Sequence, residues 1–142
     1  MSRIARVCLA VLVAVAVFGA GAAGCASARD RTVTESANGK TIRLAVGKVV
    51  AIELRETPGT GYAWRTTTKP KPRILRLLSA RFVPDAHPPG VVGFGGTAIW
   101  RYRGKRPGRT STVIKLFPPG VGRRAVRTFR LTVIARRPRN KA

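Results

Sequence analysis

Residues 57–64 read Thr57-Pro58-Gly59-Thr60-Gly61-Tyr62-Ala63-Trp64 and separate two stretches of alternating apolar residues. Proline fixes its own φ and glycine adopts backbone angles closed to other residues, so these residues predict a rigid, shaped loop. Tyr62 and Trp64 are two residues apart, which places them on one face of a following strand. We expect an exposed recognition loop anchored by a buried aromatic pair. The same residues also fit a tight β-turn with no recognition role.

Period-two alternation predicts strands on both sides of this loop. Residues 41–46 and 50–54 each place apolar side chains on one face, and a Gly-Lys step between them predicts a hairpin. Residues 74–82 fit either a strand or helical turns. Further alternating segments lie at 97–103, 112–116 and 127–135. Short strands with regular turn signals predict an all-β fold, an immunoglobulin-like antiparallel β-sandwich of about seven to eight strands.

Two further loops are rich in proline and glycine. Residues 83–96 contain Val91, Val92 and Phe94 among three prolines and four glycines. Such an apolar loop either forms a contact surface or covers the end of the core. Residues 117–122 form the third loop. If the strands alternate in direction, all three loops gather at one end of the sandwich and form a composite binding edge.

The charge of the chain is far from balanced. The 142 residues include 28 Lys and Arg but only 5 Asp and Glu, a formal net charge of +23, and 44% are hydrophobic. The length and apolar content predict one domain with a packed core. Its surface should attract anionic polymers or headgroups. The cations are scattered along alternating strands, without basic clusters between exposed aromatics, so a nucleic-acid partner is not expected.

The first 24 residues predict an export signal. Arg3 and Arg6 precede an apolar stretch, residues 7–18, which small residues follow. Residues 22–25, Ala-Ala-Gly-Cys, resemble the lipobox of bacterial lipoproteins, although Ala22 stands where leucine is usual. We expect lipidation at Cys25, a flexible tether over 25–37, and a protein exported to the cell envelope and anchored to its membrane. The alternative is an ordinary signal peptide that leaves Cys25 as a free thiol.

The chain lacks the residue sets of an enzyme. It has one histidine, His87, and its two cysteines, Cys8 and Cys25, both lie in the first 25 residues. No thiol and imidazole pair is expected. The five carboxylates are dispersed and show no metal-ligand spacing. We therefore expect no catalytic residue, metal or cofactor.

The chain resembles the chagasin family, immunoglobulin-like inhibitors of papain-type cysteine proteases. The similar parts are residues 41–54 with the 57–64 loop, and 82–85 leading to the 93–97 glycines. They resemble the family's hairpin, its Asn-Pro-Thr-Thr-Gly-Tyr/Phe-x-Trp loop and its Gly-x-Gly-Gly loop. The resemblance implies a chagasin-like domain over residues 38–136, followed by a basic tail over 137–142, and a monomer.

The resemblance implies an inhibitor that occludes a protease cleft with three loops and does not react. Tyr62 and Trp64 would support the first loop from the core. The third loop departs from the family, with Pro118-Pro119-Gly120 in place of Arg-Pro-Trp, which implies weaker or differently targeted inhibition. The alternative is a lipid-anchored basic module that binds anionic polymer, lipid or an acidic protein. The expected protease-binding residues are Thr57, Pro58, Gly59, Thr60, Gly61, Gly93, Phe94, Gly95, Gly96, Phe117, Pro118 and Pro119.

Overall fold

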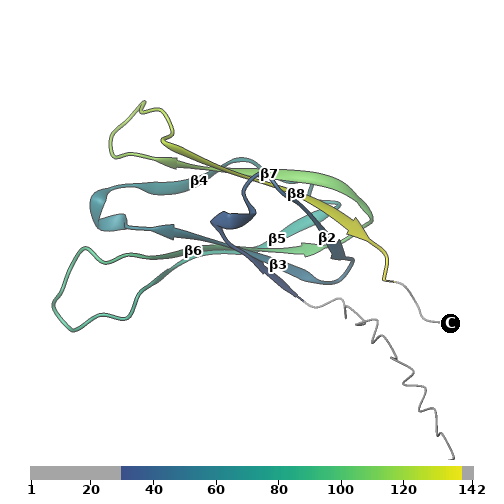
Figure 1. The fold of residues 1–142 in the computed structure, drawn as a ribbon, viewed down its shortest axis with the longest axis horizontal. Helices are drawn as coiled ribbons and strands as arrows, with labels where there is room; N and C mark the ends of the chain where they lie inside the picture. The colour runs from purple at the N-terminus through teal and green to yellow at the C-terminus, as the bar shows by residue number, and fades with distance from the viewer. Residues whose placement is uncertain (1–29, 139–142) are drawn as a thin grey trace, which may run out of the picture.

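A computed structural model describes residues 30–138 and shows two β-sheets packed face to face (Figure 1). Two 3-10 helices, η1 (Glu35–Ala37) and η2 (Pro58–Thr60), lie between strands of this region. No helix within it is long and apolar enough to cross a bilayer. The strands are β1 (Arg31–Val33), β2 (Thr41–Ala45), β3 (Val49–Glu56), β4 (Ala63–Thr68), β5 (Leu75–Pro84), β6 (Gly96–Gly104), β7 (Gly108–Phe117) and β8 (Arg127–Arg136).

One sheet has the strand order β1-β3-β6-β5 and the other β2-β8-β7-β4. The predicted all-β, immunoglobulin-like sandwich is confirmed. The expectation of purely antiparallel pairing is wrong at two places, because β1 pairs with β3, and β2 with β8, in parallel. Parallel neighbours need a crossover connection. The chain provides one for β1 and β3 by passing through β2 of the opposite sheet.

The core lies between the sheets and is formed by the inward residues of nearly every strand. Alternation explains it, since every second side chain of a strand points to the same face. Its buried aromatic residues include Trp100 and Tyr102 of β6 and Phe129 of β8, from the two opposite sheets. The other buried members are Val33, Ala37, Ile42, Leu44, Val50, Ile52, Leu54, Trp64, Leu75, Ala98, Ile114, Leu131 and Val133.

The predicted hairpin of residues 41–46 and 50–54 is wrong, because β2 and β3 belong to opposite sheets. β2 pairs with β8 and β3 pairs with β6. Both strands nevertheless point their apolar side chains into the same core, as the alternation requires. The period of a strand identifies its buried face but carries no information about its hydrogen-bonded partner.

The expected tether over residues 25–37 is wrong from Arg31 onward. β1 pairs with β3, and Val33 and Ala37 are buried. Glu35 of η1 forms an ion pair with Arg127 of β8. The Asn38 side chain donates to the carbonyl of Thr128 and accepts from the Arg130 amide, at 3.0 and 2.8 Å. The folded domain therefore begins seven residues or so before the expected start, while Cys25 lies outside the described residues.

The ambiguous stretch at 74–82 is a strand. β5 pairs with β6 over its whole length, with a register shift between Leu77 and Ser79. It is the edge strand of its sheet, and most of its side chains are exposed. Because nearly all of its side chains are exposed, β5 has no buried face that would impose an alternation of apolar and polar residues.

Candidate functional site

Three loops protrude from one end of the sandwich, at the left in Figure 1. The first loop, residues 57–62, contains η2 and joins β3 to β4. The second loop, residues 85–95, joins β5 to β6, and the third loop, residues 118–126, joins β7 to β8. They meet at one end because each joins a strand running toward that end to a strand running away from it.

The first loop lies between the other two and touches both. An ideal Cβ placed on Gly59 would lie 2.6 Å from the Cα of Gly93 in the second loop. One placed on Gly61 would lie 2.7 Å from the Cβ of Pro119 in the third loop. Real Cβ atoms do not approach other heavy atoms so closely, so glycine permits both contacts. Gly59 and Gly61 therefore allow the first loop to pack closely against both neighbouring loops.

The first loop is held in a single helical turn by its own hydrogen bonds. The amides of Thr60 and Gly61 donate to the carbonyls of Thr57 and Pro58, at 3.0 and 2.8 Å. The Thr60 hydroxyl also donates to the Thr57 carbonyl, at 2.6 Å. Gly61 ends the turn in the left-handed region, with φ of 76°. All residues from Thr57 to Gly61 are exposed, so the turn presents a preformed surface to solvent.

Of the expected aromatic pair, Trp64 lies in the core and Tyr62 lies at the surface. Trp64 is buried, and its indole N–H donates to the carbonyl of Arg55 at 2.8 Å. Tyr62 is 37% exposed, so its predicted burial is wrong. The physical reason is that β4 begins at Ala63, and the alternation that buries Trp64 does not extend back into the loop. Trp64 supports the edge from within, and Tyr62 belongs to its surface.

A bidentate ion pair closes the base of the second loop. The two guanidinium nitrogens of Arg55 donate to the two carboxylate oxygens of Asp85, at 2.7 and 2.5 Å. Next to it, the Asp85 amide donates to the carbonyl of Gly95 at 3.0 Å. Hydrogen bonding to Arg55 lowers the pKa of Asp85 below its ordinary value, and the pair raises the pKa of Arg55. Planar fork geometry makes such pairs directional, so this one orients the loop.

The apolar side chains of the second loop point outward. Val92 is 91% exposed and Val91 is half exposed. Phe94 is partly buried because the His87 ring stacks on it, with ring centroids 3.7 Å apart and planes 5° from parallel. Of the two readings of this loop, covering the core does not fit Val91 and Val92. Their exposure fits a contact surface instead.

The third loop carries both an apolar tip and cations. Its base closes where the Val126 amide donates to the Leu116 carbonyl at 2.8 Å. Phe117 lies under the Arg65 guanidinium, 5.8 Å from the ring centroid. Val121 is fully exposed, and Arg123 and Arg124 follow it on the exposed part of the loop.

Comparison with known proteins shows to which family this chain belongs. Residues 43–133 match the family described as "Chagasin family peptidase inhibitor I42". The protein belongs to the chagasin family. Chagasin of Trypanosoma cruzi is 31% identical over 94 residues, which cover 63% of this chain and 83% of that protein. Members of the chagasin family are protease inhibitors and not enzymes, as expected.

Solved structures support the same fold. The crystal structure of a cysteine protease inhibitor from Entamoeba histolytica superposes with a TM-score of 0.65 at 24% identity, covering 76% of this chain and 96% of that one. The structure of PbICP-C in complex with falcipain-2 superposes with a TM-score of 0.51 at 16% identity, covering 78% of this chain and 93% of that one. At these identities the likeness concerns the sandwich itself.

The chagasin motifs locate most of the edge but not all of it. Of the predicted residues, Gly59 with Gly93 and Gly61 with Pro119 form the contacts that join the three loops, while Thr57, Pro58 and Thr60 form the exposed turn between them. Gly96 is buried under the Phe82 ring at the start of β6, so it does not belong to the exposed edge that was predicted to include it. The sequence pattern did not indicate that Tyr62 lies at the surface or that Val121 and Arg123 belong to the edge. An exposed valine between two glycines was the available signal for Val121.

The ion pair predicts a pH-dependent second loop. Because the pKa of Asp85 is lowered in the folded state, its pairing with Arg55 contributes fully above the ordinary carboxyl pKa of about 4 and is lost as pH falls through the lowered value. Burial raises the pKa of Glu56, so protonation of Glu56 at low pH favours the folded state and opposes the effect of Asp85 on overall stability. The effect of the ion pair must therefore be measured in the second loop itself. We expect amide-exchange protection of the second loop to fall below about pH 4, while that of β7 and β8 persists.

Two variants check this expectation. Asp85→Asn removes the charge and should lower protection of the second loop at neutral pH. Glu53→Gln changes a carboxylate that belongs to neither ion pair of residues 30–138 and should leave protection unchanged. Equal protection in the Asp85→Asn variant and the parent protein would show that the loop does not depend on the pair.

Proposed function

We propose that this protein reversibly inhibits papain-like cysteine proteases by inserting the three-loop edge into the active-site cleft. The observation that supports this is the edge itself, in which an exposed, hydrogen-bonded turn is held between two neighbouring loops by the Gly59 and Gly61 contacts. Preorganised loops lose little conformational freedom on binding, so more of the contact energy appears as affinity.

The proposed mechanism is occlusion without reaction. The Thr60 turn at the centre of the edge would cover the catalytic thiol of the protease. The second and third loops would contact the two walls of the cleft, with Val92 and Val121 as their most exposed apolar side chains. Family relatives with Arg-Pro-Trp in the third loop have a large anchor there. Here Pro118-Pro119-Gly120 supplies neither the arginine nor the tryptophan, so we expect weaker or differently targeted inhibition.

The proposal includes anchoring at the cell envelope. Residues 1–24 and Cys25 support it through the apolar stretch and the lipobox-like Ala-Ala-Gly-Cys sequence. They lie outside the described residues. Mass spectrometry of the membrane fraction of cells that express the full chain would test it, since a diacylated Cys25 at the new N-terminus is expected, and Cys25→Ser should abolish the modification.

Inhibition is tested with residues 26–142, which contain every strand of the described fold, titrated against papain in moderate salt. We expect competitive, reversible inhibition. Thr60→Trp adds bulk to the exposed centre of the edge and should raise the inhibition constant about thirtyfold or more, because obstruction at an interface centre costs about 2 kcal/mol or more.

Thr128→Trp is the matched control. Thr128 is exposed on β8 and lies outside all three loops, so the inhibition constant should stay within about threefold of the parent value. Inhibition that survives Thr60→Trp would exclude the first loop from the contact. The absence of inhibition across several papain-like proteases would reject the proposed function.

A further inference from the structure

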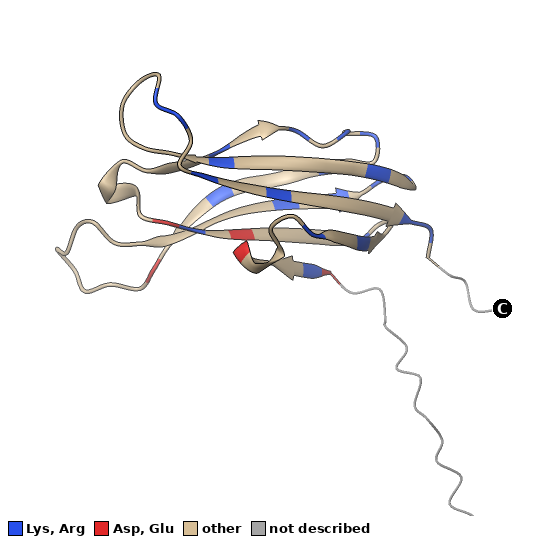
Figure 2. Ribbon diagram, turned by 45° about the horizontal axis from the view of Figure 1, so that its top comes forward, with Lys and Arg blue, Asp and Glu red and all other residues tan. Residues whose placement is uncertain are grey.

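The end of the sandwich opposite the three loops is strongly cationic. We call it the turn end; Figure 2 shows its blue segments along the turns and strand ends at the right. The only carboxylate near it within residues 30–138 is Asp30, which already accepts a hydrogen bond from the Val49 amide at 2.9 Å. Its cations are Lys48, Lys69, Lys71, Arg73, Lys105, Arg106, Arg109, Arg136 and Arg137.

The remaining carboxylates lie toward the loops or the middle of the sandwich. Glu56 ends β3 beside the first loop and Asp85 begins the second. Glu35 pairs with Arg127, where β8 leaves the third loop. The carboxylates are therefore concentrated away from the turn end, where the nine cations face Asp30 alone.

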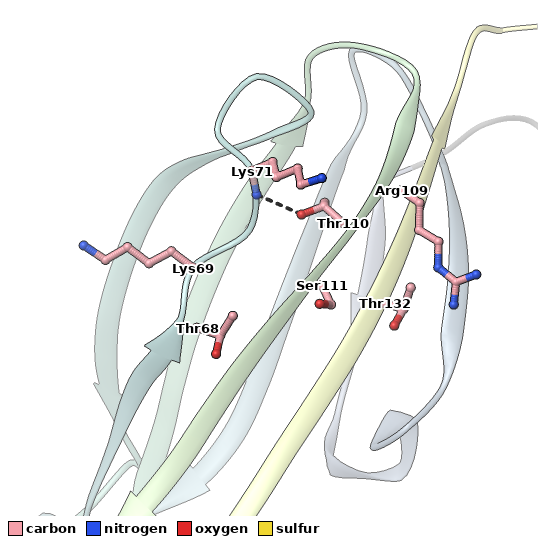
Figure 3. A pocket seen from close by; sticks show the side chains of 7 residues that line it. All are labelled: Thr68, Lys69, Lys71, Arg109, Thr110, Ser111 and Thr132. Carbon is pink, nitrogen blue, oxygen red and sulfur yellow. Dashed lines mark hydrogen bonds between the residues drawn. The ribbon is translucent and has the colours of Figure 1, made fainter.

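A hollow of about 380 Å³ lies at this end on the outer face of the β2-β8-β7-β4 sheet. Figure 3 shows Lys71 on one side of it, Arg109 on the other and hydroxyl groups between them, while the Lys69 side chain extends outward from the same side as Lys71. The β4–β5 connection is fixed there, because the Lys71 amide donates to the Thr110 hydroxyl at 2.8 Å. We call this hollow the basin; its lining residues are Thr68, Lys69, Lys71, Arg109, Thr110, Ser111 and Thr132.

The chemistry of the basin fits an oxyanion. No carboxylate lines it, and its three cations take part in neither of the two ion pairs found among residues 30–138. Cations supply the charge, and the hydroxyls of Ser111 and Thr132 can donate to further oxygens of the same group. A phosphate, with several acceptor oxygens on one centre, matches this set of donors.

The course of the chain favours a membrane as the source of that phosphate. The hydrogen bond between Asp30 and Val49 brings the chain into the domain at the turn end. Cys25 precedes Asp30 by five residues, which span at most about 18 Å. An anchor at Cys25 would hold a bilayer next to this end. Basic residues this close are attracted to anionic headgroups.

We propose that the turn end rests on anionic phospholipid headgroups, with the basin holding one phosphate, and that this contact points the three-loop edge away from the membrane. The choice of a membrane rests on the proposed anchor. The cationic site itself is independent of protease inhibition, because no residue of the basin belongs to the three loops.

Sedimentation with vesicles tests the proposal on residues 26–142, which lack the apolar stretch and Cys25. We expect binding to vesicles that contain phosphatidylglycerol and none to pure phosphatidylcholine, with affinity falling as salt rises. The triple variant Lys69→Glu, Lys71→Glu, Arg109→Glu should bind at least about tenfold more weakly. The control Lys115→Glu, Arg123→Glu, Arg124→Glu changes the charge equally at the loop end and should lose less than about threefold.

Several outcomes would overturn the proposal. Equal losses in both triple variants would mean that net charge, and not the turn end, drives binding. Binding to phosphatidylcholine alone would exclude headgroup charge. A basin-dependent interaction with a soluble sulfated polysaccharide, without vesicle binding, would identify a polymer as the partner. Vesicle-bound protein should inhibit papain with an unchanged inhibition constant. This separate readout distinguishes a failure of inhibition from a failure of membrane binding.

Discussion

Gly61→Ala is expected to raise the inhibition constant for papain about tenfold or more while the sandwich stays folded. The added Cβ would lie 2.7 Å from the Cβ of Pro119, so the first and third loops must separate. Gly61 also has a φ of 76°, where alanine is strained by about 1–2 kcal/mol. The strain lowers stability, and the displacement of the loops lowers affinity, because the edge no longer matches the cleft.

Gly39→Ala separates these two effects. Gly39 has nearly the same backbone conformation, with φ of 75°, but an added Cβ would meet no atom within 4 Å. Gly39 lies between η1 and β2, away from the three loops. We expect a similar loss of unfolding free energy, about 1–2 kcal/mol, with the inhibition constant unchanged. Thermal unfolding and papain titration of both variants measure the two quantities.

Gly59→Ala gives a second, independent measure of loop contact. Its backbone is not in the left-handed region, so the expected effect comes from the close approach to the Gly93 backbone alone. Inhibition by Gly61→Ala and Gly59→Ala that equals inhibition by the parent protein would show that the packing of the loops against each other has no part in binding.

Trp64→Ala is expected to lower the free energy of unfolding by about 3–5 kcal/mol, the usual cost of deleting a buried indole. Trp64 is buried in the core cluster, and its N–H binds the carbonyl of Arg55. The Arg127 guanidinium also lies over the ring, 5.8 Å from it. Because a domain is stable by only about 5–15 kcal/mol, this variant should melt at a much lower temperature.

Trp64→Phe tests how much of this loss of unfolding free energy comes from the hydrogen bond between the Trp64 indole and the Arg55 carbonyl. Phenylalanine retains most of the apolar packing but leaves the Arg55 carbonyl without the indole donor. We expect a loss of about 1–2 kcal/mol, measured by denaturant unfolding. Since Arg55 also holds Asp85, amide exchange in the second loop should increase in this variant. An increase in amide exchange that is confined to β4 would show that Trp64 does not support the second loop.

The sequence by itself determined the class of fold and the position of the three loops. Alternation is a local property, and it identified the buried residues of β2, β3, β6, β7 and β8 because side chains repeat every two residues whatever the partner strand. Proline and glycine act on their own backbone angles, so the loop at residues 57–61 could be recognised without any tertiary contact. The departure of Pro118-Pro119-Gly120 from the family pattern is likewise a property of the sequence.

Only the tertiary structure decided which strands pair, where the domain begins and what lies beside the loops. β2 and β3 are neighbours in sequence but join opposite sheets, because their partners are β8 and β6. Residues 31–37 have little apolar content, and their order comes from pairing with β3 and from the contact between Glu35 and Arg127. The Arg55 and Asp85 pair, 30 residues apart, and the basin combine distant residues. Such long-range contacts depend on register and crossover, which no local pattern encodes.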